Sequence, residues 1–287
     1  MADNPYQPPE TIVADPVLSE NEILVNPIKN PAGHGWQWIK DGFAYFMASP
    51  GIWIASLIIM LIIMFVLALI PILGSFLSNI LTTIFTAGLM LGCSAIDKGE
   101  PLNINHLFAG FKKNTGNLVL VSLLYLAGMI VIMLIIGLLV AVTGGASGLF
   151  NNMAANTPGS ATPEQIQAMM GVGGIAVLVG LGAMIPLAMA YYFAPVLIIK
   201  HDLGPIEAMK LSFRGCLRNM IPFLIYGIIM LILAVVASLP LFLGWLVMGP
   251  VFIASLYAAY KDIFIDVANS DSFDNDMPDN ITSQQSF

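Results

Sequence analysis

Charged residues are scarce in this sequence: they make up 9% of its 287 residues, against about a quarter in soluble domains. Hydrophobic residues make up 58%, and the mean hydropathy is +0.87. A soluble fold cannot bury that much apolar surface, so the composition indicates an integral membrane protein. No polar stretch between the hydrophobic segments is long enough to fold as a separate soluble domain.

Cysteine is nearly absent too, with only Cys93 and Cys216. Both fall in segments that we assign below to the cytoplasmic side, where thiols stay reduced, so we expect no disulfide. The N-terminus lacks the basic region and early apolar stretch of a cleaved signal peptide. The sequence also lacks a phosphate-binding loop, metal-ligand spacing and any catalytic motif, which predicts no cofactor, no metal and no enzymatic activity.

Basic residues are scarce at the two ends of the chain, which are acidic. Residues 1–34 hold five acids and one base, and residues 262–287 hold six acids and no base, whereas residues 35–261 hold nine bases and six acids. No Lys/Arg cluster is dense enough to neutralise a phosphate backbone, which excludes nucleic acid as a partner. Because the ends also lack apolar periodicity, the sequence predicts disordered acidic tails over residues 1–34 and 263–287.

Six segments are apolar and long enough to cross a bilayer core of about 30 Å, which takes roughly 20 helical residues. They are residues 52–70, 77–96, 118–142, 173–199, 221–238 and 241–260. None of them contains an ionisable residue, which disfavours proton-coupled transport. We therefore predict an all-α fold, a polytopic membrane helix bundle over residues 35–262. Pro186 and Pro195 are expected to kink the fourth span.

The basic residues predict the orientation of the spans. All ten Lys and Arg residues lie before span one, between spans two and three, between spans four and five, or just after span six. The other three connections contain none. Because short loops rich in Lys and Arg stay in the cytoplasm, this distribution predicts that both termini are cytoplasmic. Residues 143–170 then form an external loop.

Three similar segments lead into spans one, three and five: residues 38–49, 103–114 and 208–219. Each has a Phe followed six residues later by Ser or Asn, which indicates an internal repeat. Their apolar residues recur at steps of three or four, which is typical of amphipathic helices at the cytoplasmic water–lipid boundary. They act either as insertion signals and elbow helices or as readers of lipid charge. Lipid contacts would then come from Lys112, Lys113, Lys210, Arg214 and Arg218.

Small residues recur on one face of spans two and four. Such residues let transmembrane backbones approach closely, either within one chain or between copies in a homo-oligomer. They are Gly88 and Gly92 in span two, and Gly173, Ala176, Gly180 and Ala183 in span four.

Several short motifs carry a resemblance. They are Asn4-Pro5-Tyr6-Gln7-Pro8-Pro9, Gly35-Trp36-Gln37-Trp38, Ala48-Ser49-Pro50-Gly51-Ile52-Trp53, Asp97-Lys98-Gly99-Glu100-Pro101 and His106-Leu107-Phe108-Ala109-Gly110-Phe111. With them the chain resembles an uncharacterised family of bacterial six-helix inner-membrane proteins. Residues 194–219 are more loosely similar to the membrane domain that accompanies some glycerophosphodiester phosphodiesterases, whose catalytic domain this sequence does not contain. The resemblance implies the bacterial inner membrane and transfers no site residues.

The function expected from these features is that of a non-enzymatic, lipid-facing structural or accessory protein. Its partners would be membrane lipids, with a protein partner or a second copy as further candidates. The alternative is a transporter or channel for a small neutral or amphipathic solute. Its path would be lined by the kinked span four and by Asn79, Thr82, Thr83 and Thr86 of span two.

Overall fold

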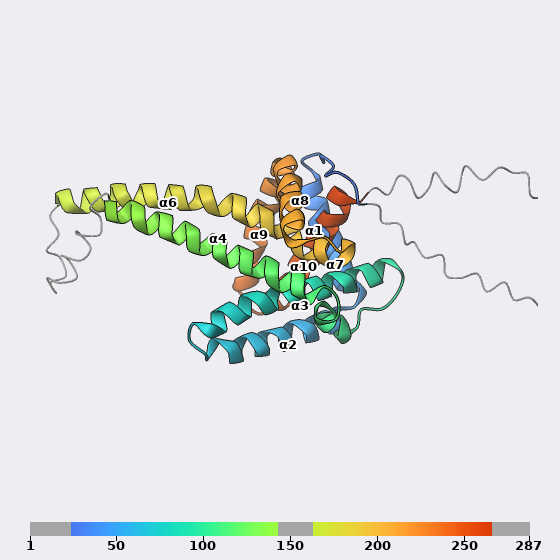
Figure 1. Ribbon diagram of the computed structural model, residues 1–287. Coiled ribbons are helices and arrows are strands. Elements are labelled where there is room, and N and C mark those ends of the chain that lie inside the picture. The colour runs from blue at the N-terminus through green and yellow to red at the C-terminus, as the bar shows by residue number, and fades with distance from the viewer. Residues whose placement is uncertain (1–23, 143–162, 266–287) are drawn as a thin grey trace, which may run out of the picture. The chain divides into compact units, whose positions relative to one another are not determined.

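The computed structural model describes residues 24–142 and 163–265. They belong to two units, of which the larger is Asn26–Phe264. The smaller unit contributes only Leu24, Val25 and Ile265 to the described residues, and Leu24 pairs with Ile265 in an antiparallel bridge. The larger unit is built from helices and turns (Figure 1), which confirms the predicted all-α fold. Residues 1–23 and 266–287, most of the two predicted tails, lie outside the described residues.

Six helical segments are long and apolar enough to cross a membrane, as the sequence predicted. Five are single helices: α2 (Pro50–Ala68), α3 (Leu73–Asp97), α4 (Thr115–Val142), α9 (Met220–Ser238) and α10 (Trp245–Phe264). The remaining one is formed by α6 (Pro163–Tyr192) and α7 (Ala194–His201). The fourth predicted span, residues 173–199, is therefore present, and its kink is a full break between α6 and α7. The last span also begins at Trp245 rather than at residue 241.

The break between α6 and α7 follows from Pro195, which has no N–H for the helix ladder and takes an early position in α7 that needs none. Pro186, in contrast, stays inside α6. The freed backbone groups bind Ser212, whose hydroxyl accepts a hydrogen bond from the Phe193 N–H at 2.9 Å and donates to the Met189 carbonyl at 2.7 Å. A side chain thus supplies the partners that lipid cannot offer.

Three shorter helices correspond to the three predicted interfacial segments: α1 (His34–Ala48), η1 (Ile104–Phe111) and α8 (Pro205–Arg218). η1 is a 3₁₀-helix rather than an α-helix, and its start is fixed by a reciprocal cap. The Asn103 side chain accepts from the Asn105 N–H at 3.0 Å, while His106 Nδ1 accepts from the Asn103 N–H at 3.1 Å. α8 packs against α6 and α7 and crosses the end of α6 rather than running along it (Figure 1).

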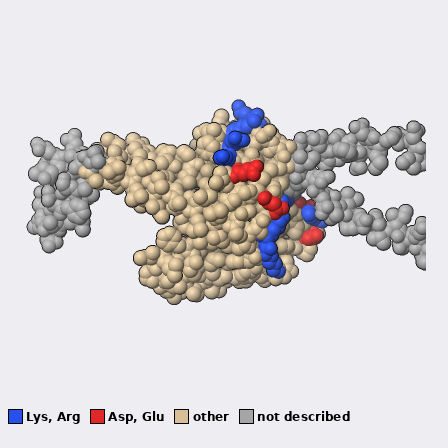
Figure 2. Space-filling view, in the orientation of Figure 1, with Lys and Arg blue, Asp and Glu red and all other residues tan. Residues whose placement is uncertain are grey.

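The spans place their charged residues together at one end of this unit, which we call the charged end. α3, α7 and α10 finish there, and α4 and α9 begin there. Lys261 at the end of α10 binds Asp97 at the end of α3, and Asn114 before α4 binds Asp202 after α7. Figure 2 shows the visible charged side chains gathered over this end, and no charged side chain is visible on the helices farther away in this view.

Two short turns close the opposite end, one between α2 and α3 and one between α9 and α10. Neither contains a polar side chain: they are Leu69-Ile70-Pro71-Ile72 and Leu239-Pro240-Leu241-Phe242-Leu243-Gly244. Ile72, Leu241 and Phe242 adopt left-handed φ values of 62°, 50° and 63°. Such conformations are costly for residues with a side chain, so the packing of each helix pair has to enforce them.

The core of the unit lies toward the charged end. Val196, Leu197, Ile198 and Ile199 of α7 are fully buried, and so are Tyr257 and Tyr260 of α10. α1 approaches α10 closely through a glycine: a Cβ atom on Gly42 would lie 2.7 Å from the Ser255 backbone nitrogen. The packed end of the molecule is therefore built from α1, α7 and the second half of α10.

Candidate functional site at the charged end

Asp97, the last residue of α3, accepts hydrogen bonds from three side chains. The Tyr45 hydroxyl lies 2.6 Å from Oδ1, and the Tyr257 hydroxyl and Lys261 Nζ lie 2.9 and 2.8 Å from Oδ2. Burial and, after it, the hydrogen bond to Asp97 raise the pKa of the Tyr45 hydroxyl above its ordinary value, so this group remains a donor at neutral pH. The Asp97 carboxylate thereby ties α1 and α10 to α3.

The last turn of α7 is held by α3 and α10. Lys200 Nζ donates to Ser94 of α3 at 2.8 Å and lies 5.6 Å from the centre of the Tyr257 ring, within cation–π range. His201 Nε2 lies 2.5 Å from the Tyr260 hydroxyl. Each ionisable group at the end of this helix therefore has a partner that holds the helix in place. In the described part of the chain, no three His, Cys, Asp or Glu side chains come close enough to hold a metal ion.

A second carboxylate, Asp262, anchors the segment before α1. Its Oδ2 accepts from Asn30 Nδ2 at 2.9 Å and from Trp38 Nε1 at 2.6 Å, and lies 2.7 Å from His34 Nδ1. The Asn30 N–H in turn donates to the fully buried Asn219 at 2.8 Å. The packed region therefore begins before the predicted tail boundary at residue 34, because these polar contacts fix the segment.

The five bases predicted to contact lipid all lie on the surface at this end. Lys112 and Lys113 follow η1, and Lys113 lies 3.8 Å from Asp202, which partly neutralises it. Lys210, Arg214 and Arg218 recur every four residues and so form a single stripe along α8. We call this set the α8 stripe. Among the described residues, none of its three members has an ion-pair or hydrogen-bond partner.

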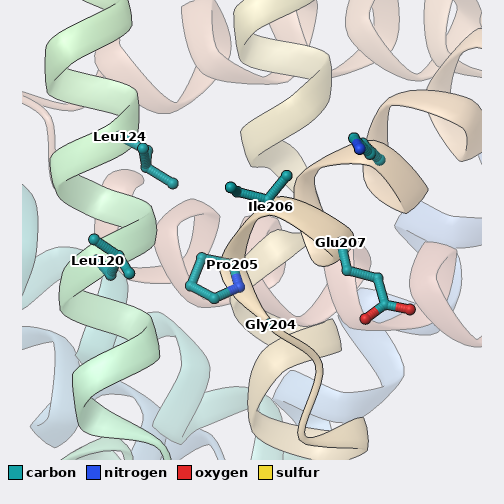
Figure 3. Close-up of a pocket in the computed structure, with 7 residues that line it drawn as sticks. Leu120, Leu124, Gly204, Pro205, Ile206 and Glu207 are labelled. Carbon is teal, nitrogen blue, oxygen red and sulfur yellow. The ribbon is translucent and has the colours of Figure 1, made fainter.

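An apolar groove of about 620 Å³ lies between α4 and the first turn of α8 (Figure 3). Leu120 and Leu124 of α4 face Pro205 and Ile206 of α8 across it, and Glu207 turns away from it. Gly204 and Lys210 complete its lining. Because Ile206 is 61% exposed, the groove opens toward the surroundings of the spans. Apolar walls beside a basic stripe suit a lipid, whose chains are apolar and whose phosphate is anionic.

The small residues predicted in span two face η1 within the same chain. A Cβ atom on Gly88 would lie 2.4 Å from the His106 carbonyl oxygen, and one on Gly92 would lie 2.3 Å from Leu102 Cδ1. A larger residue at position 88 would therefore push η1 away from α3, whereas one at position 92 would require the Leu102 side chain to move.

The small residues predicted in span four lie on α6. Ala176 is 7% exposed, Ala183 is half-buried, and a Cβ atom on Gly180 would lie 3.0 Å from Ile136 of α4. The surroundings of Gly173 lie outside the described residues. α4 and α6 thus approach closely along this face, and homo-oligomer formation through these residues stays a prediction.

Two polar residues of span two that could line a solute path face different neighbours. The Thr82 hydroxyl lies 3.9 Å from Met64 Sδ of α2. The Thr83 hydroxyl instead binds Tyr191 of α6 and accepts a 2.7 Å hydrogen bond from Ser122 of α4. Thr83 therefore joins three helices to one another.

Sequence reasoning missed the two carboxylate clusters of this end. Tyr45 and Lys261 lie 52 and 164 residues from Asp97, so no local motif connects them. The sequence did show where these two residues lie: Asp97 and Lys261 both stand at the end of a span, on the side that holds all the bases. Opposite charges on that side can come close enough to pair.

The chain is similar to a protein of Burkholderia thailandensis named a "probable inner membrane protein". The two are 27% identical over 211 residues, which cover 74% of this chain and 77% of the relative. No family model matches the chain, and no solved structure matches it significantly. This relative, together with the six membrane-spanning helices, confirms the resemblance to bacterial inner-membrane proteins. The chain is a multi-pass membrane protein.

Proposed function

We propose that this protein is a non-enzymatic component of the bacterial inner membrane that binds anionic lipid at the cytoplasmic surface through α8. The observation that carries the proposal is the α8 stripe, which is exposed and has no partner among the described residues. A basic residue close to an anionic membrane surface contributes about 1 kcal/mol of attraction. The three bases of the stripe act together because they share one line along the helix.

The orientation belongs to the same proposal. Every Lys and Arg of the chain lies in the segment before the first span, in a connection at the charged end, or at the charged end of a span. The segments that join the spans at the opposite end carry none. Short basic loops remain in the cytoplasm during insertion. The charged end is therefore assigned to the cytoplasm, together with both termini, and the α8 stripe to the inner surface of the membrane.

α8 suits this role because it is a fixed platform. Ser212 holds it to the α6–α7 break, and Gly215 lies against the Phe264 ring at the end of α10, 2.3 Å from where a Cβ atom would stand. Ile206 and Leu217 are 61% and 51% exposed. Such a helix presents apolar side chains to the acyl region and bases to the head groups.

The test is the triple variant Lys210→Gln, Arg214→Gln, Arg218→Gln, purified and titrated with lipid under native mass spectrometry. We expect binding of phosphatidylglycerol to weaken about 100-fold, corresponding to about 3 kcal/mol, and binding of phosphatidylcholine to stay unchanged. The matched control is Lys29→Gln with Lys98→Gln, which removes two exposed bases of the same end away from α8. It should keep phosphatidylglycerol binding within a few-fold.

The two roles of the bases give different outcomes in this experiment. If they act only as insertion signals, the triple variant misorients or is degraded, and its correctly inserted fraction keeps the wild-type lipid profile. Normal insertion with unchanged phosphatidylglycerol binding would likewise contradict the proposal and leave α8 as an elbow helix.

A further inference from the structure

A second groove, of about 480 Å³, lies between α1, α9 and α10. It shares no residue with the groove between α4 and α8. One wall is the exposed face of α1, and the other is formed by the second half of α9 and the first half of α10. The groove therefore joins the charged end, where Asp97 and Asp262 hold α1, to the apolar interior of the spans.

The α1 wall carries one cation between two aromatic rings. Trp36, Lys40 and Phe43 stand at helical spacing on one face of α1, and the two rings are 46% and 48% exposed. The neighbouring Asp41 accepts a hydrogen bond from Gln37 at 2.7 Å. Lys40 has no ion-pair or hydrogen-bond partner among the described residues. Tryptophan and lysine are the side chains that meet lipid head groups at a membrane boundary.

The opposite wall is apolar over its whole length. It includes Leu233 and Val236 of α9, and it follows α10 from Val251 to Gly244. Seven residues of helix correspond to about 10 Å. The groove therefore runs about 10 Å along α10 and reaches Gly244, in the turn that joins α9 and α10 at the opposite end.

From these walls we infer that the groove binds one phospholipid. Its phosphate lies at Lys40, its glycerol region beside Trp36, and one acyl chain follows α9 and α10 toward Gly244. The charge supports this occupant, because a single unpaired cation stands at the mouth and the rest of the lining is uncharged. This site is independent of the α8 stripe, so either can fail without the other.

The experiment uses the full chain, delipidated in detergent and titrated with phosphatidylethanolamine under native mass spectrometry. This lipid has no net charge, so the α8 stripe adds little to its binding. Val236→Trp fills the groove and should weaken binding at least tenfold. Lys40→Gln should weaken it about five-fold, the effect of one base near a phosphate. Val236 and its neighbour Val235 are 55% and 59% exposed, and only Val236 lines the groove.

Val235→Trp and Lys29→Gln are therefore the matched controls, and both should bind like the wild type. If Val236→Trp unfolds at a lower temperature than Val235→Trp, Phe43→Ala replaces it as the groove variant with the same expected direction. The inference is overturned if the groove variants bind like the wild type, or if Val235→Trp weakens binding as much as Val236→Trp. Unchanged binding by Lys40→Gln would overturn the phosphate position.

Discussion

In α7, Val196 and Ile199 are fully buried, whereas in α2, Leu61, Ile62 and Phe65 are 52%, 58% and 69% exposed. Both helices are apolar, but α3, α4 and α8 enclose α7, and much of α2 faces outward. The spans of this protein therefore use apolar side chains in two ways. At the charged end they form a core like that of a soluble protein, and farther along they serve as a surface for lipid.

Polar contacts follow the same division. Asp97 and Asp262 hold α1, α3 and α10 together at the charged end, and Ser212 holds α8 to the α6–α7 break. At the opposite end, the turns after α2 and α9 contain no polar side chain, and beside the second of them a single hydrogen bond, from Trp245 Nε1 to the Ser238 hydroxyl at 3.0 Å, joins α10 to α9. The charged end should therefore keep its structure when lipid is removed, whereas the opposite end depends on an apolar solvent.

The largest expected effect is all-or-none and concerns which end faces the cytoplasm. In a cysteine-free background, Ser160→Cys should react with a membrane-impermeant maleimide in intact cells, and Ser272→Cys should not, because the base distribution predicts that residue 160 lies outside. Labelling is read as a mass shift of the purified protein. If Ser272→Cys reacted and Ser160→Cys did not, the orientation would be the reverse of the one predicted.

A smaller but still large effect is expected at Cys216 of α8, which is 5% exposed. Burial raises the pKa of its thiol to about 12 from an ordinary 9.0, so the reactive thiolate is about a thousand-fold rarer at pH 7 in the folded protein. In a Cys93→Ala variant we therefore expect maleimide to react about a thousand-fold more slowly with the folded protein than with the unfolded protein.

The pH dependence of this reaction gives a second check. Because the raised pKa lies above the range tested, the rate for the folded protein should rise about tenfold per pH unit from pH 7 to 10. The rate for the unfolded protein should level off near its ordinary pKa. Fast labelling of folded protein at pH 7 would show that the charged end is not a closed core.

A third effect, measured in stability, compares the two ends directly. Asp97→Ala leaves Lys261 and two tyrosine hydroxyls without their acceptor and should lower the free energy of unfolding by about 2 kcal/mol. Phe65→Ala on the exposed surface of α2 should change it by less than about 0.5 kcal/mol in detergent. Reversible unfolding in a detergent of increasing denaturing strength measures both. Equal losses would remove the distinction between core and lipid surface.

Hydropathy and charge were sufficient to predict the six spans and the gathering of charge at one end, because membrane crossing depends on composition over about 20 residues. The kink that Pro195 predicts in the fourth span was visible in the sequence, but the Ser212 hydroxyl that binds the backbone at the break was not, since Ser212 stands 19 residues after Phe193 on another helix. The burial of Trp38 and Phe46 in α1 was missed for a similar reason. Amphipathic spacing shows which face is apolar and does not show whether lipid or protein covers it.

The apolar turns also bear on how the chain enters the membrane. A lysine or arginine at the bilayer centre costs about 2.5–3.5 kcal/mol, and the turns after α2 and α9 contain neither, nor any other polar side chain. The helix pairs α2–α3 and α9–α10 can therefore leave the translocation machinery as complete hairpins, with no polar segment to carry through. In the proposed orientation, polar residues are carried across only by residues 143–162, between α4 and α6, and by the first turn of α6, which contains Glu164. We expect its translocation to be the slowest step in the biogenesis of this protein.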